Sequence, residues 1–504
     1  MNIRFTFLLI TAILLLNLPA KAQKTTSNGP KTEIGDRSRI LVFGEDESNL
    51  YIFSSDLNVS WGDYDDSNIS IYDKNKHTLV SEFELDDDYD ALTAFLDGNN
   101  VVIINGKYNK KTKCVEYGKC VVPVNGKTPK KFVFTPSVSV PTNGLEVENI
   151  CAFLSIDRTK LAFATYTHPK KNDKEYVLDV HICDIDGTEI SHVNEHIDIS
   201  CPDRVKGGYL TPNGTLYLDE DVRTPSDVKF AIGGYDGRGK WTKHYTCITS
   251  SGEVVLCKVE LEEGAIYNPY SIVLPNQHLF FAGICKKGLV TMEIDGNGEG
   301  EPVLHEMDIL KRPESIHYED KTMKNDDFDF IPNQILPLSN GNRLIVAHQY
   351  KSVMGTTANG HIYIDHFHRN IHLFMLDKNG ELTASNTLPN VNINDNSPHK
   401  DIPCVFELNN EVYLVYNENK SNLASPSNKT WKTLQYNKGS QECVVAGKLD
   451  SDLHFTPEII YKPKSTKDFN NFEHFDQIIN VSNDAIYYIL HRDGDNHIEV
   501  LTEN

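Results

Sequence analysis

The chain lacks the residues and motifs that would assign it to a familiar activity. It has 49 Lys and Arg against 71 Asp and Glu, a net charge of −22, whereas a nucleic-acid partner requires a basic face. It has no C-x-x-C pair, which excludes zinc ribbons and thioredoxin-type redox motifs. Without a P-loop, an H-E-x-x-H or a G-x-S-x-G elbow, NTPase, zincin and serine hydrolase chemistry have no support. We therefore expect no nucleic-acid partner and no cofactor, and the sequence predicts no catalytic residue.

Long apolar runs are absent except at the N-terminus. Arg4 precedes an apolar run from Phe5 to Leu18, and Ala20-Lys21-Ala22 follows it. A positive start, an apolar run and an A-x-A site are typical of a secretory signal peptide. The alternative is a membrane anchor, but the run is shorter than the ~20 residues that a spanning helix needs. We expect residues 1–22 to be a signal peptide, residues 23–504 to form a single exported domain, and no membrane span to remain after cleavage.

The ten cysteines are an even number, and an exported chain meets an oxidising compartment, so disulfides are permitted. Cys247 and Cys257 flank a turn at Ser251-Gly252, and Cys114 and Cys120 are close in sequence, so each pair is a candidate bridge. Burial of the cysteines as small apolar thiols is an equal alternative. The sequence leaves the pairing open.

A recurring unit is the most informative feature of the chain. Each unit has a polar turn followed by a short, densely apolar segment, as in Leu50–Phe53 or Val101–Ile104. These segments begin at residues 50, 101, 161, 216, 279, 344, 412 and 486, at intervals of 51 to 74 residues. Unbroken apolar runs of this length, bounded by Gly, Pro, Asn and Asp, are typical of strands buried on both faces.

A second predicted strand follows in each unit and usually ends at a hairpin turn. These strands lie at residues 69–73, 121–124, 180–185, 247–248, 290–294, 371–376, 442–446 and 498–501. Several of the turns contain Asn-Gly or Asp-Gly, as at Asn125-Gly126, Asp186-Gly187 and Asn379-Gly380. Because these dipeptides accept positive φ at both central residues, we expect two-residue type I′ turns.

The pattern predicts an all-β fold, a β-propeller of four-stranded blades in which neighbouring blades bury each other's faces. The alternative is two or three unrelated β domains, but no Pro/Gly/Ser-rich linker divides the chain. Eight blades are favoured and seven are possible. The last unit has no outer strand after Leu501, so we expect an N-terminal strand, the segment Lys31–Phe43, to supply it and close the ring.

Several segments resemble uncharacterised exported repeat proteins of Bacteroidota bacteria, a group of hypothetical proteins without an established activity. The likeness covers most of residues 23–504 and is carried by Val42–Asp46, Ile71–Lys74, Gly106–Thr112, Ile345–Tyr350 and Val412–Asn419. The resemblance implies a propeller-like fold and export. It supplies no catalytic residue.

Two segments have the spacing of metal ligands. His361, His366, His368 and His372 form the densest imidazole cluster, and on a strand His366 and His368 share a face, which is how a zinc or copper site begins. Asp295 to Glu306 has the ligand spacing of a calcium loop, although Pro302 does not fit and no helix frames it. Exposed imidazoles and an ordinary hairpin turn are the favoured interpretations, so we predict no metal ligand.

Acidic and aromatic residues also gather in places. Asp63–Asp66 and Asp86–Asp90 contain bunched carboxylates, which hold a cation or serve as a general acid in some proteins, but an acidic solvated loop is more ordinary. Tyr413–Tyr416 and Tyr487-Tyr488 offer aromatic surface for a sugar, although strands favour aromatics for packing alone.

The sequence therefore favours an exported, non-enzymatic binding or scaffold protein of the periplasm or cell envelope, with an unknown protein or glycan as its partner. The alternative is a glycan-active enzyme with a carboxylate pair in the central funnel of the propeller.

Overall fold

The computed structural model describes most of the chain after the N-terminal segment. The described ranges are 23–25, 39–57, 64–84, 90–124, 134–170, 175–198, 204–223, 241–258, 267–285, 287–307, 317–318, 329–356, 362–394, 402–424, 430–431, 434–435, 442–461, 474–481, 485–492 and 495–502. The expected signal segment 1–22 lies outside them. Over these ranges the regular structure consists of strands and a five-residue helix, α2 (Lys420–Ala424). No helix in this part of the protein is long and apolar enough to cross a membrane.

The strands form seven four-stranded sheets, one five-stranded sheet and one two-stranded pair across the described ranges. We number the large sheets in chain order. Sheet 1 contains β2 (Arg39–Glu45), β3 (Asn49–Leu57), β4 (Tyr64–Asp73) and β5 (Thr78–Glu84). Sheet 2 contains β6 (Asp90–Asp97), β7 (Asn100–Asn109), β8 (Cys114–Pro123) and β9 (Thr135–Pro141). Sheet 3 contains β10 (Glu146–Leu154), β11 (Lys160–His168), β12 (Tyr176–Asp184) and β13 (Glu189–Ile197).

The next two sheets repeat this arrangement of four antiparallel strands. Sheet 4 contains β14 (Arg204–Leu210), β15 (Leu216–Arg223), β16 (Trp241–Ile248) and β17 (Val254–Lys258). Sheet 5 contains β18 (Tyr267–Val273), β19 (Leu279–Cys285), β20 (Gly288–Ile294) and β21 (Val303–Glu306).

The last three sheets differ from this arrangement in a fifth strand, in an insertion between strands and in a fourth strand taken from the N-terminus, respectively. Sheet 6 contains β23 (Asp329–Pro337), β24 (Arg343–Thr356), β25 (Ile362–Leu376), β26 (Leu382–Asn394) and, parallel to β26, β30 (Leu434–Gln435). Sheet 7 contains β27 (Cys404–Leu408), β28 (Glu411–Asn419), β31 (Glu442–Leu449) and β32 (Phe455–Tyr461). Sheet 8 contains β33 (His474–Val481), β34 (Ala485–Arg492), β35 (Asp495–Thr502) and β1 (Gln23–Thr25). The segment between β28 and β31 also supplies β29 (Thr430–Trp431), which pairs with β22 (His317–Tyr318).

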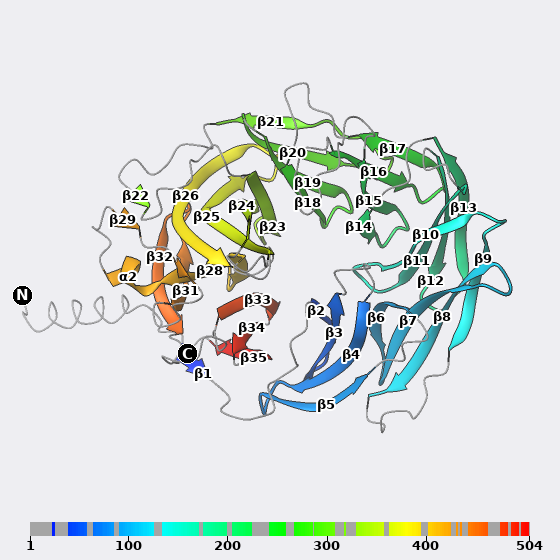
Figure 1. The fold of residues 1–504 in the computed structure, drawn as a ribbon, viewed down its shortest axis with the longest axis horizontal. Helices are drawn as coiled ribbons and strands as arrows, with labels where there is room; N and C mark the ends of the chain where they lie inside the picture. Colours follow the sequence, from blue (N-terminus) through cyan, green and yellow to red (C-terminus); the bar gives the residue numbers. More distant parts are fainter. Residues whose placement is uncertain are drawn as a thin grey trace, which may run out of the picture.

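The sheets follow one another around a ring, with the first strand of each nearest the centre (Figure 1). The propeller of four-stranded blades is therefore confirmed, with seven four-stranded blades and a five-stranded sheet between sheets 5 and 7. All eight apolar segments found in the sequence are second strands of their sheets, and the strands predicted to follow them are third strands. The repeating unit of the sequence is thus one sheet of the ring.

Each pair of adjacent sheets shares a hydrophobic cluster, which we call a seam. In β11, Leu161 and Phe163 belong to the seam with sheet 2, whereas Ala162, Ala164 and Tyr166 belong to the seam with sheet 4. Burying one such Leu or Phe side chain contributes roughly 1.5–3 kcal/mol. The prediction that these strands are buried on both faces is confirmed, because consecutive side chains point to opposite faces and both faces are covered.

The ring is closed by an N-terminal strand, but not by the predicted segment. β1 pairs with β35, so that Gln23 lies opposite Thr502, and it completes sheet 8. The described part of Lys31–Phe43 instead lies in β2, the first strand of sheet 1, where Ile40 pairs with Ser54 of β3. The prediction was wrong because two units each lacked a strand: the first unit lacked its inner strand and the last unit lacked its outer strand. The apolar residues of β2 suit the inner position.

The described turns at Asp186-Gly187, Asp295-Gly296 and Asn379-Gly380 have three residues rather than the predicted two. At the β12–β13 turn, the Asp184 N–H donates to Thr188 O and the Gly187 N–H donates to Asp184 O, both at 2.8 Å. Gly187 has a φ of 97°, whereas Asp186 is not among the residues with positive φ. This is a type I turn followed by one left-handed residue, so only the glycine needs a positive φ. The turn at Asn125-Gly126 lies outside the described residues.

The same turn recurs at Gly298, between β20 and β21, and at Gly380, between β25 and β26, with φ of 80° and 86°. These two glycines form a matched pair. A Cβ on Gly380 would meet nothing within 4 Å, whereas a Cβ on Gly298 would lie 2.8 Å from the Val255 Cβ across the seam between sheets 4 and 5.

We predict that Gly380→Ala lowers the free energy of unfolding by about 1 kcal/mol, the cost of a left-handed Ala. Gly298→Ala should cost roughly 1–3 kcal/mol more, because it also overpacks the seam. Urea unfolding followed by circular dichroism measures both changes. Equal losses in the two variants would contradict the close packing of sheets 4 and 5 at this turn.

Candidate functional site

The predicted histidine cluster is divided between two seams. His361 and the side chain of His366 lie outside the described residues. His368 on β25 lies opposite Tyr350 on β24, and its ring centroid is 5.0 Å from that of His348. His372 contacts Phe330, with ring centroids 5.2 Å apart, and its Nδ1 lies 3.1 Å from the Thr387 hydroxyl.

A β-bulge causes this division. Asn370 is an extra residue in β25, because Gln349 pairs with Arg369 and the adjacent His348 pairs with Ile371. The bulge reverses the alternation of faces, so that His368 faces sheet 7 and His372, opposite Ala347, faces sheet 5. Burial, together with the nearby His348, lowers the pKa of His372 to about 3 and keeps the ring neutral. The expectation of exposed imidazoles is therefore wrong for His368 and His372, which are 2% exposed and pack in different seams rather than around one ion.

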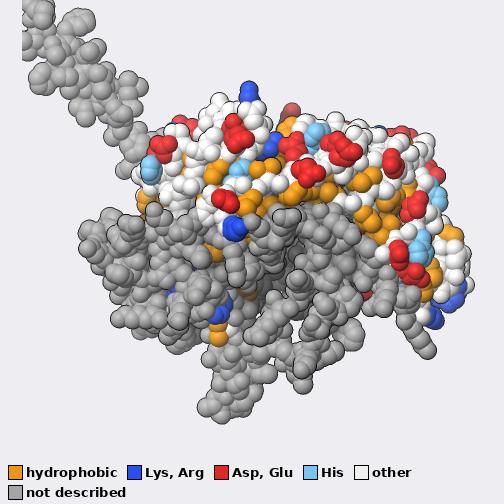
Figure 2. Space-filling view, turned by 90° about the horizontal axis from the view of Figure 1, so that it is seen from above, with side chains coloured by type: hydrophobic (Ala, Val, Ile, Leu, Met, Phe, Trp, Pro, Cys, Tyr) orange, Lys and Arg blue, Asp and Glu red, His pale blue; other side chains and the backbone are white. Residues whose placement is uncertain are grey.

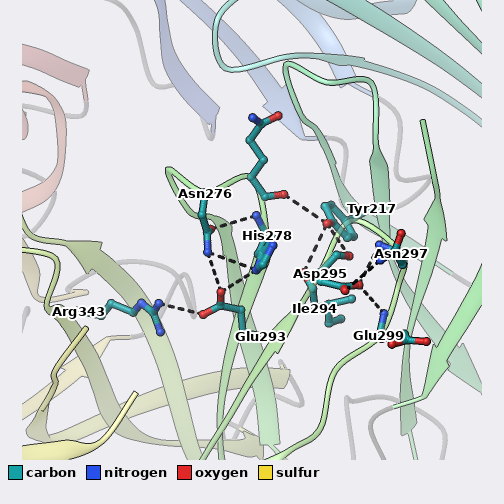
Figure 3. Close-up of polar contacts among 10 residues, drawn as sticks. Tyr217, Asn276, His278, Glu293, Ile294, Asp295, Asn297, Glu299 and Arg343 are labelled. Atoms are coloured by element: carbon teal, nitrogen blue, oxygen red, sulfur yellow. Dashed lines mark hydrogen bonds and ion pairs between the residues drawn. The ribbon is translucent and has the colours of Figure 1, made fainter. Parts of the chain in front are cut away.

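The segment predicted to resemble a calcium loop is a hairpin turn (Figure 3). The Asp295 Oδ1 accepts hydrogen bonds from the backbone N–H groups of Asn297 (2.8 Å) and Glu299 (3.0 Å), and the Asp295 carbonyl accepts one from the Tyr217 hydroxyl (2.9 Å). Glu306 pairs with Gly288, at the opposite end of β20. Asp295 and Glu306 are therefore separated by the length of a strand and cannot bind one calcium ion.

A second polar network in the same view joins sheets 5 and 6. The Arg343 guanidinium of β24 forms an ion pair with Glu293 of β20 (2.9 Å) and lies over the Phe280 ring. Glu293 also lies 2.8 Å from both the Asn276 amide nitrogen and the His278 Nδ1 (Figure 3). Although burial raises the pKa of Glu293, these hydrogen bonds and Arg343 lower it overall. The network fixes one sheet against the next and leaves Glu293 ionised.

The remaining predicted segments give no site within the described residues. The side chains of the two acidic clusters, Asp63–Asp66 and Asp86–Asp90, lie outside them. Tyr416, Tyr487 and Tyr488 are buried in seams, so packing explains these aromatics. No disulfide is present among the nine described cysteines. Cys114 and Cys120 lie on the same strand, and Cys247 and Cys257 are not opposite one another in their hairpin.

A buried carboxyl group lies in the seam between sheets 3 and 4. Glu220 on β15 accepts hydrogen bonds from the hydroxyls of Tyr166 (2.8 Å), Thr246 (2.9 Å) and Tyr176 (3.3 Å). Burial raises the pKa of Glu220 to about 7, although these hydrogen bonds oppose the shift. The neighbouring seam, between sheets 2 and 3, contains a cavity with a volume of about 20 Å³, which has room for roughly one water molecule. Glu220 has the pKa of a general acid, but its side chain is 0% exposed in the seam between sheets 3 and 4, which makes its role structural.

A further cluster, which the sequence analysis did not single out, lies on the outer strands of sheet 3. Asp179 and His181 of β12 lie opposite Asn194 and His192 of β13. The Asp179 Oδ1 is 3.1 Å from His181 Nε2 and 3.2 Å from His192 Nε2. The signal in the sequence was an Asp-x-His before the Asp186-Gly187 turn and a His-x-Asn after it, because pairing across a hairpin brings such residues to one face.

Comparisons with known proteins leave the family open. No protein-family model and no curated protein matches the chain. A Bacteroides caccae protein of unknown function is 13% identical, with 69% of this chain and 93% of that chain covered and a TM-score of 0.28. BamB from Moraxella catarrhalis is 10% identical, with 96% and 97% covered and a TM-score of 0.32. The β-propeller domain of the Trilobed protease from Pyrococcus furiosus is 10% identical, with 84% and 96% covered and a TM-score of 0.31.

We predict that Glu220→Gln flattens the pH dependence of stability. The folded protein keeps the Glu220 proton up to about pH 7, whereas the unfolded chain releases it near its ordinary pKa of 4.5. The free energy of unfolding therefore falls as the pH rises through this window, by at most roughly 3 kcal/mol. The Gln variant should lose this component, measured as the difference in urea-unfolding free energy between pH 5 and pH 8. Exposed Glu195→Gln is the control, and a Glu220→Gln slope equal to the wild-type slope would contradict the prediction.

Proposed function

We propose that this chain is an exported, non-enzymatic binding or scaffold propeller of the bacterial periplasm or cell envelope, and that a partner protein binds its outer strands. The signal-like pattern of residues 1–22 supports export. Cleavage after Ala22 would make Gln23 the first residue of the mature chain, and Gln23 is also the first residue of the closing strand β1. Removal of the signal would thus leave the strand that completes sheet 8.

Exposed apolar side chains on the outermost strands are the observation that carries the binding role. Ile190 of β13, Leu256 of β17 and Val303 of β21 are 45%, 36% and 51% exposed. They come from the last strands of three consecutive sheets, 3, 4 and 5. Figure 2 views the ring from the side that carries β17 and β21, and hydrophobic side chains lie there among acidic ones. Apolar contacts supply affinity, and the acidic surroundings favour a partner with basic residues.

Sheet 6 supports strand addition as the binding mode. The segment after β28 supplies β30, which pairs in parallel with the outer strand β26. An outer edge of this propeller thus accepts an extra strand from elsewhere in the chain. An extended, basic segment of a partner protein could pair with β13, β17 or β21 in the same way, with side-chain contacts to the exposed apolar residues.

The test is a pull-down from the native cell envelope with residues 23–504 as bait. We predict that the triple variant Ile190→Lys, Leu256→Lys and Val303→Lys recovers at least tenfold less of the partner, because it removes the apolar contacts and places cations opposite basic residues. The matched control carries Val80→Lys and Ile459→Lys, two exposed apolar positions on outer strands of sheets 1 and 7.

Enrichment of the same protein by wild type and control, with loss in the triple variant, supports the proposal. Equal enrichment by all three baits would refute binding at these strands. A glycan array incubated with the wild-type protein tests the alternative function, since turnover of a glycan would establish an enzyme instead.

A further inference from the structure

The cluster on the outer strands of sheet 3 has the chemistry of a transition-metal site. Asp179 and His181 alternate on β12, and His192 lies directly opposite His181 on β13. Directly opposed residues of an antiparallel pair project from the same face, as do residues two apart on a strand. The three side chains are therefore presented together by regular strand geometry, on rigid elements rather than on a loop.

The ligand atoms are already close enough to share one ion. The Asp179 oxygen and the two imidazole nitrogens lie within 4.8 Å of one another, and two of the three separations are 3.1 and 3.2 Å. Ligands bound to tetrahedral zinc at about 2.0–2.1 Å are roughly 3.3–3.4 Å apart. The two imidazole rings are stacked, with centroids 4.0 Å apart and an angle of 10° between their planes, so their Nε2 atoms approach Asp179 side by side. Because the lone pair of each Nε2 lies in the plane of its ring, one of the two rings turns when both bind a single ion.

Two further residues, Glu189 and Asn194, contact the ligand side chains and fix their orientation. The Glu189 Oε2 is 2.6 Å from His181 Nδ1, and because a carboxylate only accepts, this nitrogen carries a proton. His181 Nε2 also faces a carboxylate oxygen, that of Asp179, so a metal ion would bind Nε2 in place of the proton between them. The Asn194 amide donates to the Asp179 Oδ2 (2.5 Å), which holds the carboxylate with Oδ1 toward the imidazoles. Carboxylate-to-His and amide-to-carboxylate contacts of this kind orient the ligands in known metal sites and strengthen binding.

We propose that Asp179, His181 and His192 bind a zinc ion, with Glu189 and Asn194 as supporting residues. Two imidazoles and one carboxylate suit zinc and the neighbouring transition metals, whereas calcium and magnesium prefer ligand sets composed of oxygen. Three protein ligands leave a fourth position for water or for a group of a partner molecule. The site is reachable, since Asp179 and His181 are about nine-tenths buried but the His192 side chain is 42% exposed.

A bound zinc ion would join the outermost strand β13 to β12. Without it, β13 is held to the sheet by its hydrogen bonds to β12 and by Val193 and Ile197, which pack in the seam with sheet 4. The ion adds a bond between side chains on the other face of the hairpin and stabilises the edge of the ring. This inference does not depend on the proposed partner, because it concerns the purified chain alone.

The experiment is a calorimetric titration of zinc into EDTA-treated residues 23–504, with calcium as the comparison ion. Because the chain contains 19 histidines and ten cysteines, the decisive quantity is the difference between variants. His192→Ala removes one ligand, and His196→Ala is the matched control, an exposed histidine of the same strand whose ion-pair partner is Glu175. Wild type and His196→Ala should bind one more zinc ion than His192→Ala, with no corresponding calcium site.

Two other variants make the assignment specific. Glu189→Gln should keep the stoichiometry but weaken zinc binding 10- to 100-fold, as expected for a supporting residue. Asp179→Asn should lose the ion like His192→Ala, and it serves as the second ligand variant should either variant fail to fold by circular dichroism. Cobalt substitution should give visible absorption of a four- or five-coordinate site in wild type and His196→Ala but not in His192→Ala. Equal zinc stoichiometry and affinity in wild type and His192→Ala, including no binding by either, would overturn the proposal.

Discussion

The structure depends on burial of apolar side chains between neighbouring sheets. Every described sheet offers an apolar surface on each face, so no sheet is covered until it has a neighbour on both sides. The ring satisfies this requirement because the last seam, between sheets 8 and 1, joins Ile489 and Val500 to Leu50 and Ile52. β1 then completes sheet 8 beside that seam. Closure thus removes an exposed apolar face and an exposed strand edge at the same place.

Apolar contacts alone do not determine the position of one sheet relative to the next. Hydrogen bonds from buried hydroxyl groups specify that position. The Tyr117 hydroxyl of sheet 2 donates to the Ala164 carbonyl of sheet 3 at 2.7 Å, and the Tyr209 hydroxyl of sheet 4 donates to the Ser271 carbonyl of sheet 5 at 2.9 Å. Tyr166 reaches from sheet 3 to Glu220 of sheet 4. A buried hydroxyl without a hydrogen bond destabilises the folded protein. Sliding one sheet along the next would break these hydrogen bonds, so each of them favours the observed position. This use of tyrosine accounts for part of its abundance among the strands.

The sequence was sufficient for the fold because strand burial and turn composition repeat in every unit. It was insufficient where a single residue changes the geometry. The extra residue Asn370 moves His372 to the face opposite His368. The spacing of these histidines in the sequence does not indicate a bulge. The turns were assigned to the wrong type because Asp-Gly and Asn-Gly suit both two-residue and three-residue hairpins. The better signal was the aspartate three residues before the glycine, as in Asp295 and Gly298 or Asp377 and Gly380, since its carboxylate accepts the turn's own N–H groups.

The same reasoning explains why the metal-binding cluster escaped the sequence analysis and why it lies where it does. His192 is more than ten positions from Asp179 and His181, and only the β12–β13 register brings it to them. The seams are filled by matched apolar surfaces, and the described cavity between sheets 2 and 3 admits little more than one water molecule. A group that must exchange an ion or a partner with solvent therefore has to lie away from the seams. On the outer strands β12 and β13, the His192 side chain is 42% exposed, so this cluster meets the condition.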